Sequence, residues 1–89
     1  KSHYSPDATV VLDVEPQPGD GLIALAEFKT PAGVARVAAP KTVTEYAAVL
    51  YSALRRADAL GLSRLVAITP KENELALAIV DRLQRASHK

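Results

Sequence analysis

The second half of the sequence alternates between two hydrophobic periods, and this alternation limits the possible folds more than any other feature. Residues 34–39 (VARVAA) and 63–70 (SRLVAITP) are short runs rich in β-branched side chains, as is typical of strands. Residues 41–62 and 71–89 instead place their apolar side chains at helical spacing. Strand, helix, strand and helix in succession predict a parallel βαβ unit with a right-handed crossover.

Both predicted helices carry signals at their ends. Thr42 and Glu45 fit a capping box, in which each side chain accepts a hydrogen bond from an amide that the helix leaves unpaired. Gly61 stands where a C-terminal cap is expected, and Asn73 is the predicted N-cap of the second helix. These signals set the expected helix boundaries.

The first half of the chain predicts strands and loops without a helix. Residues 8–14 (ATVVLDV) and 22–28 (LIALAEF) are predicted strands, and residues 15–21 (EPQPGDG) form a loop rich in Pro and Gly. The short turn at 29–33 permits an antiparallel hairpin between 22–28 and 34–39, although a wider crossing stays open. We therefore predict one small α/β domain, a Rossmann-like sandwich. It has about four strands in a largely parallel or mixed sheet, and two main helices.

Composition excludes several classes of protein. A net charge of +1, no Trp and a single Phe argue against a dedicated nucleic-acid binder. The absence of Cys removes thiol catalysis and thiolate metal sites and fits a cytoplasmic protein. No apolar run is long enough to span a membrane, and the dinucleotide-binding fingerprint G-x-G-x-x-G is missing. No metal-ligand cluster or catalytic triad stands out, so we expect no catalysis from these residues alone.

Polar residues follow two of the predicted strands, where open α/β folds bind anions. Lys41, Thr42 and Thr44 open the first helix, and Lys71 and Asn73 open the second. These five are the candidate anion-binding residues, with simple helix capping as the favoured alternative. The other Arg side chains and the acidic side chains are interpreted as lying on solvent-exposed faces of the helices. His3 and His88 have no fixed spacing and define no metal site.

Asp58 is unusual because it lies at the edge of the apolar face of the first helix, four residues after Leu54. A structural salt bridge or a loop cap is the favoured role for such a carboxylate. A ligand role is the less favoured alternative.

Three stretches in order resemble a known family. KSHYSP at 1–6, LYSALRRADALGLSRLVA at 50–67 and LALAIVDRLQRAS at 75–87 are similar to the linker, a central helix and the closing helix of two-domain L-threonylcarbamoyladenylate synthases, which have a YrdC-type catalytic domain. The resemblance covers nearly the whole chain. It implies that residues 1–7 end an interdomain linker and residues 8–89 form the C-terminal domain, with the catalytic domain outside this chain.

The resemblance also implies a function. The parent enzyme condenses L-threonine, bicarbonate and ATP, with magnesium, into threonylcarbamoyl-adenylate and pyrophosphate, for the later modification of tRNA. The implied partner of this domain is the N-terminal catalytic domain of the same chain, and this domain itself has no cofactor and meets tRNA only indirectly. It anchors the linker over the catalytic site. The implied nucleotide-contacting residues of the linker are Lys1, Ser2, His3, Tyr4 and Asp7.

Two departures from the family pattern stand out. The loop at 15–21 is too short for the helix that the family usually has between its first two strands, and Glu74, Leu75 and Ala76 replace a G-L-G segment.

Two other functions stay open beside the leading one. The chain can be a nucleotide- or tRNA-binding regulatory module without catalysis, or a purely structural domain that stabilises its catalytic partner.

Overall fold

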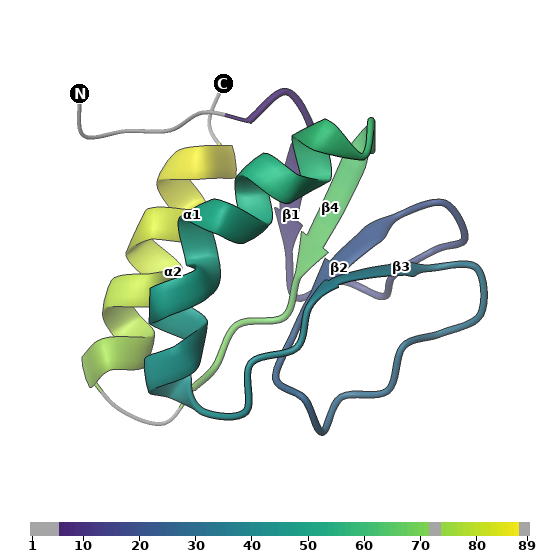
Figure 1. Ribbon diagram of the computed structural model, residues 1–89. Helices are drawn as coiled ribbons and strands as arrows, with labels where there is room; N and C mark the ends of the chain where they lie inside the picture. The colour runs from purple at the N-terminus through teal and green to yellow at the C-terminus, as the bar shows by residue number, and fades with distance from the viewer. Residues whose placement is uncertain (1–5, 72–73, 88–89) are drawn as a thin grey trace.

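A computed structural model describes residues 6–71 and 74–87 of the chain. They form four strands and two helices (Figure 1). The elements in chain order are β1 (Thr9–Leu12), β2 (Gly21–Ile23), β3 (Ala35–Ala38), α1 (Val43–Ala59), β4 (Arg64–Ala67) and α2 (Glu74–Ser87). The predicted α/β class, the four strands and the two helices are therefore confirmed.

The strands form one parallel sheet in the order β1-β4-β2-β3. Val10 in β1 lies opposite Leu65 in β4, and Leu22 in β2 lies opposite Val66 in β4. β4 therefore enters the sheet between the two strands that come first in the chain. The loop that joins β1 to β2 contains no helix, as its length predicted.

The antiparallel hairpin that the turn at 29–33 permitted does not form, and the alternative that was left open is the one observed, because β2 and β3 pair in parallel. β2 ends at Ile23 instead of residue 28, so the connection to β3 runs over residues 24–34. This longer connection lets the chain return to the starting edge of the sheet, which a parallel neighbour requires. The turn signal at 29–33 lies in the middle of this return loop.

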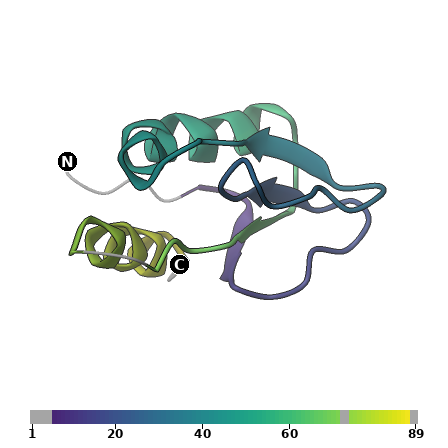
Figure 2. The same ribbon diagram turned by 90° about the horizontal axis from the view of Figure 1, so that it is seen from below.

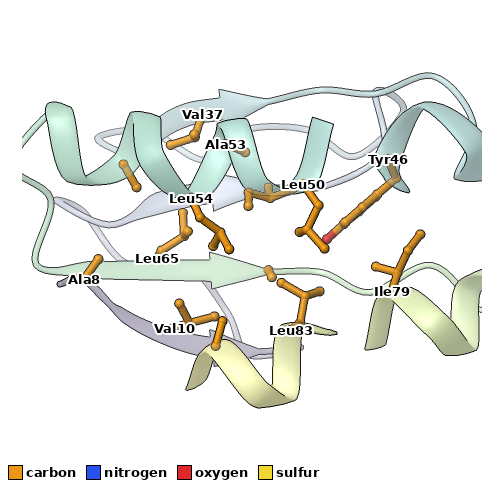
Figure 3. Packing of buried hydrophobic residues seen from close by; sticks show 14 residues of the cluster. Ala8, Val10, Val37, Tyr46, Leu50, Ala53, Leu54, Leu65, Ile79 and Leu83 are labelled. Atoms are coloured by element: carbon orange, nitrogen blue, oxygen red, sulfur yellow. The ribbon is translucent and has the colours of Figure 1, made fainter. Parts of the chain in front are cut away.

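Both helices cover the same face of the sheet (Figure 2). Side chains alternate along a strand, so Val10, Ile23 and Leu65 face the helices. Leu50 and Leu54 of α1 and Ile79 and Leu83 of α2 meet them to form the main core (Figure 3). These side chains are at most 1% exposed, apart from Val10 at 3%.

The ends of α1 follow the sequence signals. The Glu45 amide donates to the Thr42 hydroxyl at 3.1 Å, and the Glu45 carboxylate accepts from the Lys41 amide at 2.8 Å. The second bond of the box thus reaches one residue further back than expected. Gly61 has a φ of 74°, and the amides of Gly61 and Leu62 donate to the carbonyls of Asp58 and Ala57. This is a Schellman motif, which satisfies carbonyls at the helix end.

The opposite face of the sheet has no helix among the described residues. Leu22, Ala24 and Val66 are buried there, under Phe28 and Val34 from the loop at 24–34. Arg36 holds this loop in place. Its guanidinium donates to the carbonyls of Ala24, Leu25 and Phe28 at 2.7–3.0 Å, and to the Thr30 hydroxyl at 2.7 Å.

Candidate functional site

The segment that follows the linker motif is built into the domain. Pro6 is fully buried, and Ala8 is 1% exposed and belongs to the main core. Between them Asp7 is exposed. The chain therefore enters the folded body at Pro6, just before β1 begins.

Asp58 on α1 holds this entry point from the other side. Its Oδ1 accepts hydrogen bonds from the amides of Asp7 and Ala8, both at 3.1 Å, and its Oδ2 accepts from the Asp7 amide at 3.2 Å. Figure 1 shows this segment passing beside the C-terminal end of α1. Hydrogen bonds to a carboxylate are among the stronger ones in proteins. Asp58 is thus a loop cap, the structural role that the sequence favoured, and we call the Asp58 contact with residues 7–8 the linker clamp.

A second group of polar side chains lies where β1 and β4 end, and we call it the carboxyl-edge cluster: Asp13, Thr69 and Lys71. The Asp13 carboxylate accepts from the Thr69 amide at 2.8 Å and from the Thr69 hydroxyl at 2.7 Å. Lys71 Nζ lies 3.5 Å from Asp13 Oδ1 and donates to the Thr69 hydroxyl at 3.1 Å. Asp13 has a φ of 55°, in the left-handed region that few residues other than Gly adopt.

Electrostatics favour the ionised form of Asp13. Burial by itself raises the pKa of this carboxyl, but the hydrogen bonds from Thr69 and the charge of Lys71 outweigh burial and lower the pKa below its usual value. Nearby, burial and the Asp13 charge raise the pKa of Tyr46 well above its ordinary value. The Tyr46 hydroxyl donates to the Ile68 carbonyl at 3.0 Å, so it stays protonated.

A cleft of about 430 Å³ opens beside the cluster, between the residues that follow β2 and those that follow β4. Its apolar lining comes from Leu25, Phe28, Ile68 and Pro70. Glu27, Thr69 and Lys71 supply its polar groups. The volume is within the range of small-molecule sites in proteins.

The structure separates the predicted anion-binding residues into two places. Lys41, Thr42 and Thr44 lie at the start of α1, where the Lys41 amide and the Thr42 hydroxyl take part in the capping box. Lys71 lies in the cleft after β4. Asn73, like Lys1, Ser2, His3 and Tyr4, lies outside the described residues. Anion binding at either helix start stays a prediction.

Sequence reasoning missed Asp13, Thr69 and Glu27. A sequence signal for the first two was present, because each is a polar residue directly after an apolar run, residues 10–12 for Asp13 and residues 65–68 for Thr69. Ligand sites of open parallel sheets lie at these strand ends. Glu27 gave no such signal, because Ala26 and Phe28 flank it within the predicted strand 22–28 and the observed end of β2 at Ile23 was not predicted.

Two further side-chain contacts are structural. Asp20 is 7% exposed and accepts from the Gln17 amide at 2.9 Å and from Arg64 Nε at 3.1 Å, which fixes the turn before β2. Arg85 and Asp81 on α2 form the i,i+4 ion pair that the helical spacing allows, at 3.1 Å.

Within residues 6–71 and 74–87, no three acidic, His or Cys side chains are grouped so that they could hold a metal ion. Neither helix in that part of the chain is long and apolar enough to cross a membrane.

Comparison with known protein families matches residues 1–88, nearly the whole chain, to the family described as threonylcarbamoyl-AMP synthase, C-terminal domain. The chain belongs to this family. No curated protein and no solved structure matches the chain significantly. The match includes residues 1–5 as well as the folded body. The resemblance of the three sequence stretches is thereby confirmed.

Proposed function

We propose that this chain is the accessory C-terminal domain of a threonylcarbamoyl-AMP synthase and that it anchors the linker over the catalytic site. The parent enzyme joins L-threonine, bicarbonate and ATP into threonylcarbamoyl-adenylate and releases pyrophosphate. ATP and magnesium bind to the catalytic domain of the same chain. The residues described here supply no catalytic group.

The linker clamp is the observation that carries this proposal. A lid can exclude water from a reactive adenylate only if its ends are fixed relative to the site that it covers. Asp58 and the buried Pro6 fix the end of the linker motif to α1 and to the start of β1. The position at which the linker motif joins the folded body is therefore fixed.

The test uses the full reading frame and measures pyrophosphate release from ATP that depends on threonine and bicarbonate. Asp58→Ala removes the clamp, and Asp81→Ala is the matched control because Asp81 is an exposed helical carboxylate far from residues 6–8 in the sequence. We expect Asp58→Ala to raise the KM for ATP roughly tenfold, since one lost set of charge-assisted bonds is worth about 1.4 kcal/mol or more. Asp81→Ala should leave this KM unchanged.

Two outcomes contradict different parts of the proposal. Absence of threonine-dependent pyrophosphate release from the wild-type full chain would refute the synthase function itself. If release is normal but Asp58→Ala and Asp81→Ala have equal KM values, the anchoring role is wrong and the domain has another task. Melting temperatures of both variants show whether a change in KM reflects unfolding instead of a loosened linker.

A further inference from the structure

The cleft beside β4 lies between two neighbouring strands whose following segments run to opposite faces of the sheet. β2 and β4 are neighbours in the sheet and run parallel. The chain that leaves β4 continues into α2 on the helix-covered face. The chain that leaves β2 carries Phe28 to the opposite face. Adjacent parallel strands whose following segments go to opposite faces leave a crevice at their carboxyl ends, where open α/β folds bind ligands.

The two walls of the cleft present opposite charges. Lys71, from the β4 side, has a side chain that is 68% exposed, so it can contact a ligand. Its nitrogen lies 3.5 Å from Asp13 Oδ1 and donates to the Thr69 hydroxyl at 3.1 Å and to the Thr69 carbonyl at 3.4 Å. Two of these three contacts are long, so a ligand anion can replace one of them. Glu27 comes from the β2 side. Its carboxylate makes no hydrogen bond or ion pair with any residue in the described ranges 6–71 and 74–87.

Between these charges the lining is apolar, because Leu25, Phe28, Ile68 and Pro70 complete it. Small-molecule sites commonly combine such walls with a few polar groups that orient the ligand. A ligand that matches this cleft has an anionic group for Lys71, a cationic group for Glu27 and an apolar body. We propose that the cleft binds a free α-amino acid with an apolar side chain.

The charge balance favours this zwitterion over a simple ion. An anion such as phosphate would pair with Lys71 but would also meet the Glu27 and Asp13 carboxylates. A simple cation would be repelled by Lys71 while pairing with Glu27. Only a ligand that carries both charges satisfies both walls. The inference is independent of the proposed synthase function, since it concerns residues that do not touch the linker clamp.

The experiment is a titration of the ¹⁵N-labelled chain followed by backbone amide shifts. The probe is L-leucine, compared with three analogues that each lack one feature. Glycine lacks the apolar side chain, 4-methylpentanoate lacks the amino group, and 3-methylbutylamine lacks the carboxylate. We expect leucine to shift the amides of 25–28 and of residues 68, 69 and 71, and each analogue to bind roughly tenfold more weakly, as loss of about 1.4 kcal/mol implies.

Two charge variants assign the groups. Lys71→Gln should weaken leucine about tenfold but bind the amine analogue at least as tightly, because a repelling charge is removed. Glu27→Gln should weaken leucine similarly but bind the carboxylate analogue at least as tightly. Lys41→Gln is the control, because Lys41 is an exposed lysine at the other helix start. Both cleft residues have exposed side chains, and dispersed amide spectra verify that the variants fold.

The proposal is overturned by any of three results. The first is that leucine leaves the amides of 25–28 and of residues 68, 69 and 71 unshifted up to its solubility limit, or shifts those at the start of α1 instead. Equal binding of leucine and of one single-charge analogue shows that the site takes a simple ion. Equal loss of affinity in Lys71→Gln and Lys41→Gln shows a general charge effect without a site.

Discussion

Arg36 offers the sharpest test of how this fold is held together. Its guanidinium makes five hydrogen bonds, to four carbonyls and to the Thr30 hydroxyl, at 2.7–3.0 Å. These bonds tie the loop at 24–34 to β3. We predict that Arg36→Lys, which keeps the charge, destabilises the chain substantially. A lysine has three donors on one nitrogen and cannot reproduce the flat fork of the guanidinium.

The size of the effect follows from the bonds that are lost. At least two of the five hydrogen bonds cannot form with lysine, and the carbonyls they leave lie in partly buried positions. Losing such bonds and leaving their acceptors unpaired costs about 2 to 4 kcal/mol in total. A chain of this length has a free energy of unfolding of only about 5 to 13 kcal/mol. The melting temperature should fall by at least about 8 °C.

The assay is thermal and urea denaturation followed by circular dichroism, with Arg55→Lys as the matched control. Arg55 is exposed on α1 and makes no hydrogen bond or ion pair within the described part of the chain. If Arg36→Lys melts within about 2 °C of Arg55→Lys, the loop does not depend on the guanidinium fork and the reasoning is wrong.

Three further predictions concern stability. Gly61→Ala should cost about 1 kcal/mol in urea denaturation, because a left-handed φ of 74° strains any side chain although open space surrounds the position. A cost near zero would contradict a Schellman end for α1. Tyr46→Phe should cost about 1 kcal/mol at neutral pH through the lost bond to the Ile68 carbonyl. Wild-type Tyr46 should show no phenolate absorbance until the chain unfolds in alkali, since its pKa is raised. The folded pKa of Asp13 lies below its unfolded value of 3.8, so its stabilisation is present above that pH and is lost as the pH falls through the folded pKa. Asp13→Asn should therefore flatten the fall in stability below about pH 4, and an unchanged acid profile would show that Asp13 is not a source of that fall.

The helices were the most predictable part of the structure, because their signals are local. Thr42, Glu45 and Gly61 act within a few residues of their own positions, so the sequence alone defines the ends of α1. β1 and β4 were also predictable, since a continuous apolar run is what a buried parallel strand requires.

The pairing of β2 and β3 was not predictable, because the residues that decide it are far apart. β2 ends early since Ala24 and Leu25 give their carbonyls to Arg36, a residue more than ten positions away. In the sequence, no feature distinguishes Arg36 from any other charged residue within a predicted strand. The same limit applies to the candidate sites, since Asp13 meets Thr69 and Asp58 meets Asp7 only after the sheet and helices have assembled.

The linker clamp also gives the domain a mechanical property. Among the residues that the structure describes, β1 is an edge strand with β4 as its only neighbour, and it begins two residues after Asp7. A pull on the chain before Pro6 therefore acts first on the packing of Pro6 and the bonds to Asp58, and only after these yield does it load the β1–β4 ladder. Asp58 belongs to α1, and the other end of α1 follows β3, the strand at the far edge of the sheet. Tension at residue 7 is therefore shared across the whole width of the domain.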